Sequence, residues 1–175
     1  MGLATMVTQR LLNILAMVLL VNSAVPRVLA QAPARFFQTL SRPTNQTTCE
    51  TMDCWLEATR SCTPSKFLTD LSIGIAATNS VYELWGPTAA GGCVYYQFVK
   101  SLEAFGQNVP DSTGMEILCV YPQADDLTLE WEVFLGKRDG SFGGTGGLVN
   151  AKTRISISSK TLNDRQVAQC AIKSP

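Results

Sequence analysis

The chain has 175 residues, with 14 basic residues, 14 acidic residues and no histidine. The absence of histidine excludes Ser-His-Asp and Cys-His catalytic groups and every histidine-ligated metal or haem site. The balanced charge gives no electrostatic footprint for nucleic acid, so we expect no nucleic-acid partner. We expect no cofactor either.

An apolar stretch of eleven residues, Leu11–Val21, follows Arg10 near the N-terminus. It is shorter than the roughly 20 residues that cross a bilayer, and it fits the apolar region of a signal peptide. Val28 and Ala30 supply suitable residues before a cleavage site. We therefore expect residues 1–30 to be a cleaved signal peptide. The mature protein would be secreted or periplasmic, with no stable membrane insertion.

Residues 31–46 contain proline, glutamine and threonine and are expected to form a flexible N-terminal arm. Asn45-Gln46-Thr47 fits the N-glycosylation sequon, so Asn45 is a glycosylation site if the host is eukaryotic. Residues 47–175 are expected to form a single disulfide-stapled α+β domain.

A capping box predicts the first helix, with Thr47 as N-cap and Glu50 three residues later. Apolar residues then recur at helical spacing until Pro64, which predicts a helix over residues 48–61.

Four strand-like segments follow, and short turns at Ala77–Ser80 and Gly86–Gly92 predict an antiparallel meander. On such a strand Tyr95 and Tyr96 must face opposite sides of the sheet. The four segments are Ser65–Ala76, Val81–Trp85, Cys93–Leu102 and Met115–Tyr121.

The C-terminal third is less regular. Leu127–Leu135 alternates as a half-buried strand does, although helical spacing fits it almost as well, and residue propensity favours the strand. Gly136–Asn150 reads as a glycine-rich surface loop, Thr153–Ser158 as a strand, and Thr161–Ile172 has weak helical character.

The predicted fold class is therefore α+β, with an N-terminal helix packed on an antiparallel sheet of four to six strands. By analogy of layout alone, one helix followed by a meander resembles the cystatin-like and NTF2-like arrangements.

Six cysteines in an exported chain predict a disulfide framework. If the helix covers residues 48–61, helical geometry keeps the first three cysteines apart, so that each must reach one of the last three. A local bridge becomes possible only if Cys49 or Cys62 lies just off the helix. No C-x₂-C spacing suggests zinc. The cysteines are Cys49, Cys54, Cys62, Cys93, Cys119 and Cys170.

Candidate binding residues are aromatic, because exposed aromatic side chains dominate contact surfaces. The same residues could instead fill the space between the helix and the sheet. We single out Tyr82, Trp85, Tyr96 and Phe142.

Acidic pairs are the other candidates. Asp125 with Asp126, or Glu130 with Glu132, could form a glycosidase dyad or a calcium site. On a strand, Glu130 and Glu132 would share one face at a workable separation. Alternating glutamates on a solvent-exposed face need no function.

Three functions remain open from the sequence. The first is a secreted or periplasmic non-enzymatic binding or interaction module for an unknown extracellular protein, glycan or small apolar ligand. The second is a carrier of a small apolar ligand, with its pocket between helix and sheet. The third is a carboxylate-dependent hydrolase. No residue is assigned a catalytic, cofactor-binding or metal-binding role.

Overall fold

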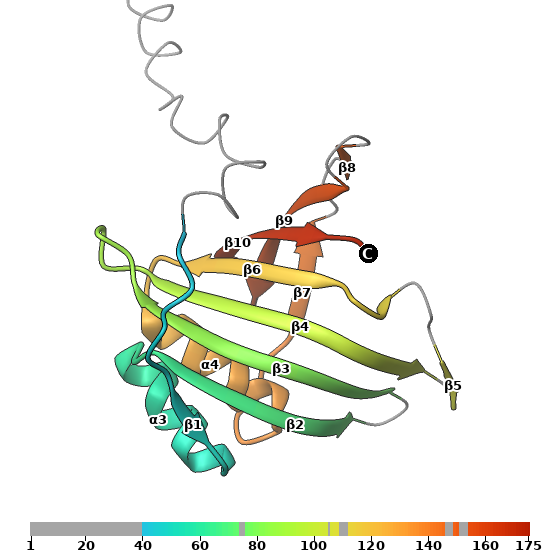
Figure 1. Ribbon diagram of the computed structural model, residues 1–175, viewed down its shortest axis with the longest axis horizontal. Coiled ribbons are helices and arrows are strands. Elements are labelled where there is room, and N and C mark those ends of the chain that lie inside the picture. The colour runs from blue at the N-terminus through green and yellow to red at the C-terminus, as the bar shows by residue number, and fades with distance from the viewer. Residues whose placement is uncertain (1–39, 74–75, 105, 109–111, 146–148, 151–153) are drawn as a thin grey trace, which may run out of the picture. The chain divides into compact units, whose positions relative to one another are not determined.

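The computed structural model describes residues 40–73, 76–104, 106–108, 112–145, 149–150 and 154–175 (Figure 1). These residues belong to one compact unit, residues 33–175. The expected signal peptide and most of the expected arm lie outside the described residues.

Ten strands and two helices are present in this part of the chain. In chain order they are β1 (Thr47–Cys49), α3 (Met52–Ser61), β2 (Ser65–Ile73), β3 (Ala76–Pro87), β4 (Cys93–Ala104), β5 (Gln107–Asn108), β6 (Glu116–Tyr121), α4 (Ala124–Phe134), β7 (Phe142–Thr145), β8 (Val149–Asn150), β9 (Ile155–Leu162) and β10 (Arg165–Lys173).

All ten strands form one mixed sheet. Eight of them follow the order β1-β2-β3-β4-β6-β10-β9-β7, while β5 pairs with β4 and β8 pairs with β9. The β1–β2 pair is parallel and the other described pairs are antiparallel. The predicted meander is present as β2, β3, β4 and β6.

The predicted fold class is nevertheless wrong. A helix on an antiparallel sheet of four to six strands, in a cystatin-like or NTF2-like layout, accounts for only part of a mostly β structure. The sheet is larger than predicted because segments expected to be loop or helix pair as strands. These are β1 before the first helix, β7 and β8 in the glycine-rich segment, and β10 near the C-terminus.

The first helix starts later than predicted. Thr51, not Thr47, is the N-cap of α3, and its hydroxyl accepts a hydrogen bond from the Cys54 amide at 3.2 Å. Cys62 ends the helix with φ 49° in the left-handed region. Cys49 consequently belongs to β1 rather than to the helix.

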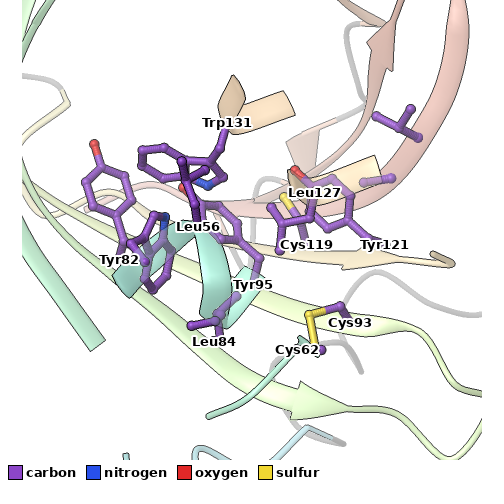
Figure 2. Close-up of a cluster of buried hydrophobic side chains, with 14 of the residues drawn as sticks. Leu56, Cys62, Tyr82, Leu84, Cys93, Tyr95, Cys119, Tyr121, Leu127 and Trp131 are labelled. Carbon is purple, nitrogen blue, oxygen red and sulfur yellow. A yellow bond between two sulfur atoms is a disulfide. The ribbon is translucent and has the colours of Figure 1, made fainter. Parts of the chain in front are cut away.

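The six cysteines form three disulfides, Cys49–Cys54, Cys62–Cys93 and Cys119–Cys170. The Cys49–Cys54 pair contradicts the prediction that the first three cysteines cannot pair with one another. It forms because Cys49 lies before the helix, which is the condition under which a local bridge was expected to be possible. Cys62–Cys93 ties the end of α3 to the start of β4 (Figure 2), and Cys119–Cys170 joins directly opposed residues of β6 and β10. Such cross-links are consistent with an oxidising compartment.

Residues 127–134 belong to α4 and Leu135 is its C-cap, so the strand prediction for residues 127–135 is wrong. Leu127 and Trp131, four residues apart, are both buried on the side facing the sheet. Thr128 Oγ1 donates to Thr59 Oγ1 of α3 at 3.0 Å, which joins the two helices. In the described residues neither helix has the length and apolar character needed to cross a bilayer.

Two further predictions are wrong, one of a turn and one of a helix. Ala77–Ser80 lies inside β3, paired on both sides, and the predicted C-terminal helical segment is a hairpin of β9 and β10. Asn163 and Asp164, with φ 50° and 61°, form its two-residue turn. Consecutive positive φ values are characteristic of the tight hairpin turns whose twist matches that of the strands.

The core lies between the helices and one face of the sheet. Aromatic rings from four neighbouring strands meet two tryptophans from the helices, with centroid separations of 5.0–6.4 Å (Figure 2). The rings are Phe67, Tyr82, Tyr95, Tyr121, Trp55 and Trp131. The opposite face of β3 and β4 is crossed by residues 40–46, as Figure 1 shows.

Candidate functional site

The four candidate aromatic residues lie in three separate places. Tyr82 faces the helices and is only 3% exposed. Trp85 and Tyr96 lie on the opposite face, stacked with ring centroids 5.1 Å apart. Phe142 on β7 is 52% exposed and lies far along the strand order from both groups. The structure thus brings Trp85 and Tyr96 together, but not with Tyr82 or Phe142.

A cavity of about 170 Å³ lies between α4 and the sheet. Its size is comparable to that of an engineered cavity of about 150 Å³ that holds benzene. Aromatic rings line much of it, and Lys160 and Glu130 supply the two charged groups of its lining. The lining residues are Thr78, Tyr82, Tyr95, Gln97, Glu130, Trp131, Phe134 and Lys160.

The secondary structure explains how these side chains meet. Strand alternation points Tyr82 of β3 and Tyr95 of β4 towards the helices. On α4 the spacing of Glu130, Trp131 and Phe134 places all three along the side that covers the sheet. Because the sheet curls, Lys160 of β9 reaches α4 although β10 and β6 separate β9 from β4.

The charged groups form a closed network at the cavity wall. Lys160 Nζ lies 2.5 Å from Glu130 Oε1 and donates to the Tyr121 hydroxyl oxygen at 3.1 Å. The Tyr121 hydroxyl in turn donates to Glu130 Oε2 at 2.6 Å. The same ammonium lies 5.1 Å from the Tyr95 ring centroid and 5.7 Å from that of Tyr121. The distance to Tyr95 fits cation–π contact, whereas Tyr121 meets the ammonium through its hydroxyl group at the ring edge.

The tyrosines of the site are held in their neutral form. Burial raises the pKa of Tyr95 and of Tyr121 well above the ordinary value, and the charge of Glu130 raises both further. Burial also raises the pKa of Tyr82, against the lowering effect of the Ser80 and Thr78 hydroxyls. These phenols therefore act as hydrogen-bonding groups rather than as bases near neutral pH.

A second polar chain runs along the sheet side of the cavity. The Tyr95 hydroxyl donates to Gln97 Oε1 at 3.3 Å, and Gln97 Nε2 donates to Ser80 Oγ at 3.3 Å. The hydroxyls of Ser80 and Thr78 lie 2.8 Å apart. These bonds orient Gln97 and Thr78 and leave the aromatic rings as the main apolar walls.

The opposite face carries its own charged network. The carboxylate of Glu83, fully buried, accepts hydrogen bonds from the Arg42 guanidinium and, at 3.0 Å, from Trp85 Nε1. The Tyr96 hydroxyl donates to Glu116 Oε2 at 3.1 Å, and Lys173 Nζ lies 2.6 Å from Glu116 Oε1. Burial, followed by the charge of Glu116, raises the pKa of Tyr96.

The proposed glycosidase geometry is wrong. Because residues 127–134 are helical, Glu130 and Glu132 do not share a face. Glu130 lines the cavity, whereas Glu132 Oε1 lies 3.3 Å from Arg60. Asp126 is buried and ion-paired with Arg165. In the part of the chain that the structure describes, no group of three or more acidic or cysteine residues could hold a metal ion.

Sequence reasoning missed Lys160 and did not group Trp131 with Phe134. The helical spacing of Trp131 and Phe134 was visible but was ranked below strand alternation. Lys160 stands two residues before the buried Leu162 but five residues after the buried Ile155, so strand alternation counted from these two positions points to opposite sides and could not have identified this lysine.

Comparison with known proteins finds no matching family model, curated protein or solved structure. The function must therefore be argued from the site's own chemistry. A ring-sized space with aromatic walls and an ion pair at one side can hold a small molecule and orient one polar end of it.

Proposed function

We propose that this chain is an exported, non-enzymatic module that binds a small, largely apolar molecule in the cavity beneath α4. The cavity between Tyr82, Tyr95, Trp131 and Phe134 is the observation that carries this proposal. Export is supported by the apolar N-terminal stretch and the three disulfides. Secretion and periplasmic export both fit these features.

The geometry favours binding over hydrolysis. Glu130 is engaged by both Lys160 and Tyr121, and Glu132 pairs with Arg60 away from the cavity. A pair of carboxylates flanking one bond is the requirement for glycoside hydrolysis. The arrangement around Glu130 instead supports a fixed polar wall that orients a ligand.

The cavity favours one small ring over a lipid chain. Its volume of about 170 Å³ is below the 300–1,000 Å³ typical of pockets for drug-sized ligands. At about 1 kcal/mol per non-hydrogen atom, a ligand of eight such atoms would bind with a Kd of about 1 μM. We therefore expect affinities in the micromolar range or weaker.

Titration with neutral ring compounds tests this proposal. Toluene, indole and 2-phenylethanol should raise the melting temperature of the mature protein. Toluene and 2-phenylethanol should also change its tryptophan fluorescence, because Trp131 lines the cavity. Thr78→Met should weaken binding of these probes at least tenfold, since a flexible methionine side chain fills irregular space. Thr48→Met places the same side chain at an exposed position of β1 and should leave binding unchanged.

Circular dichroism and melting curves of both variants establish that they are folded. If none of the three probes shifts the fluorescence or the melting temperature of the wild-type protein up to its solubility limit, the proposal is wrong. Equal losses of affinity in Thr78→Met and Thr48→Met would also contradict it.

A further inference from the structure

The groups that surround the Lys160 ammonium together form a binding site for a cation. A carboxylate oxygen of Glu130 lies 2.5 Å from it, and the phenol oxygen of Tyr121 lies 3.1 Å from it. The rings of Tyr95 and Tyr121 lie within 6 Å. Carboxylates and aromatic faces are the groups that recognise organic ammonium ions.

The two members of this ion pair differ in how readily they can move. Glu130 is carried by α4, its side chain is 16% exposed, and the Tyr121 hydroxyl holds its second oxygen. Lys160 reaches the site from β9 on a flexible four-carbon stem, and its side chain is 29% exposed. A rotamer change can therefore take the Lys160 ammonium to solvent while the Glu130 carboxylate stays in place.

With Lys160 displaced, the site selects cations. The Glu130 carboxylate would face the cavity with one oxygen unpaired, and burying an unpaired charge is unfavourable. The ring face of Tyr95 carries negative potential, and the hydroxyl oxygen of Tyr121 accepts a hydrogen bond from the ammonium, so both favour a cation over an anion. An anionic ligand would lie beside Glu130, which α4 holds at the cavity wall.

We propose that the cavity takes a small primary arylalkylamine, with its ammonium in the place of the Lys160 ammonium and its ring among Tyr82, Trp131 and Phe134. This inference rests on the proposed function, because it names the ligand class of the same cavity. Lys160 is then an intramolecular competitor that keeps Glu130 paired in the unliganded protein. It swings outward when the amine enters.

While Lys160 is paired with Glu130, an amine cannot bind there. The apparent affinity for the amine is therefore the intrinsic affinity multiplied by the fraction of molecules in which Lys160 has moved away. Replacing Lys160 should therefore strengthen amine binding. A charge-assisted hydrogen bond of ordinary strength corresponds to a gain of about ten- to a hundredfold. A neutral ligand does not displace the Lys160 ammonium, so replacing Lys160 should change the affinity for such a ligand by less than about threefold.

Three probes with the same ring and tether test this: 2-phenylethylamine, 2-phenylethanol and 3-phenylpropionate. Their affinities are measured by calorimetry and tryptophan fluorescence at neutral pH for the wild type, Lys160→Met and Lys160→Met/Glu130→Gln. We expect Lys160→Met to bind the amine ten- to a hundredfold more tightly than the wild type. The double variant should bind amine and alcohol about equally.

The opposite face supplies a matched control. Lys173, Glu116 and Tyr96 repeat the same three residue types, with Lys173 Nζ 2.6 Å from Glu116 Oε1, but none of them lines the cavity. Lys173→Met should leave amine affinity unchanged. Should Lys160→Met fail to fold, Lys160→Gln carries the same comparison, with a gain in the same direction.

The outcomes separate the two proposals. Tighter binding of the acid than of the amine to Lys160→Met, or unchanged amine affinity after the Glu130→Gln change, overturns the amine inference. Alcohol binding in the same experiment leaves the proposed function in place. An equal gain in Lys173→Met also overturns the inference, and no binding of any probe to any protein overturns both proposals.

Discussion

At the scale of single residues, the buried carboxylate of Glu83 depends on the chain segment before the first strand. The Glu83 side chain is fully buried, whereas the Arg42 side chain that neutralises it is 56% exposed. Trp85 Nε1 supplies the only other hydrogen bond that the described residues direct to this carboxylate. Residues 40–46 are thus held on the sheet by one ion pair and by Gln46, whose amide donates to two carbonyl oxygens.

Arg42→Ala should lower the free energy of unfolding by about 1–3 kcal/mol. The loss comes from leaving the Glu83 charge buried with one partner, and it is reduced because solvent reaches the Arg42 side of the pair. Urea unfolding measures it, and Arg42→Ala/Glu83→Gln should recover much of the loss. Lys137→Ala, which removes a solvent-exposed pair with Asp53, is the control and should leave the curve unchanged. A stability equal to that of the wild type in Arg42→Ala would refute this account.

Part of the candidate site was visible in the sequence at this scale. The predicted alternation of Tyr95 and Tyr96 follows from strand geometry alone, and Tyr82 was singled out as aromatic. That reasoning could not determine that Tyr82 faces the cavity and Trp85 the opposite side. Which face is covered depends on α4, and α4 was predicted as a strand.

At the scale of elements, local patterns failed where tertiary pairing outweighed them. In residues 127–135 alternation and helical spacing were nearly equal. The burial of the adjacent residues Leu127 and Thr128, which a strand would direct to opposite faces, and the bond from Thr128 to Thr59 of α3 fit the helix. In residues 161–172 the two-residue turn was missed because Asn163 and Asp164 lack the glycine of the commonest hairpin signal. By contrast, β4 and β6 were found because aromatic and β-branched residues are concentrated there.

The same turn yields a stability prediction. Asp164 has φ 61°, a conformation that glycine adopts without the steric cost of a Cβ atom. Asp164→Gly should therefore raise the free energy of unfolding by about 0.5 kcal/mol, and Asp164→Ala should lower it by about 1 kcal/mol. Paired thermal melts of the two variants check the signs. A gain for alanine over aspartate would show that the turn differs from the one described.

At the scale of the whole molecule, all four tyrosines of the chain resist ionisation. Burial is the first cause in each case, and nearby groups modify its effect. Tyr82 and Glu130 raise the pKa of Tyr95 further, and Glu130, Tyr95 and Asp126 raise the pKa of Tyr121 further. Glu116 and Glu83 raise the pKa of Tyr96, whereas Arg42 lowers it. The hydroxyls of Ser80 and Thr78 lower the pKa of Tyr82.

These shifts predict an alkaline limit of stability. Because the folded-state pKa values exceed the unfolded value near 10, the contribution of the tyrosines is complete below about pH 10 and is lost as pH rises further. Near-ultraviolet absorbance should show no tyrosinate in the folded protein at pH 10. Its appearance at higher pH should coincide with unfolding measured by circular dichroism. Substantial tyrosinate in a folded protein at pH 10 would contradict the burial of these side chains.

The three covalent cross-links enclose consecutive stretches of sequence, 49–54, 62–93 and 119–170, which neither nest nor overlap. A protease cut within the second or third stretch therefore leaves the fragments joined by a sulfur–sulfur bond. A cut between 94 and 118 severs every covalent connection between the two halves of the sheet. After a cut between β5 and β6, the β4–β6 ladder, the packed rings and side-chain contacts such as the Thr59–Thr128 hydrogen bond between the helices would keep the nicked halves together.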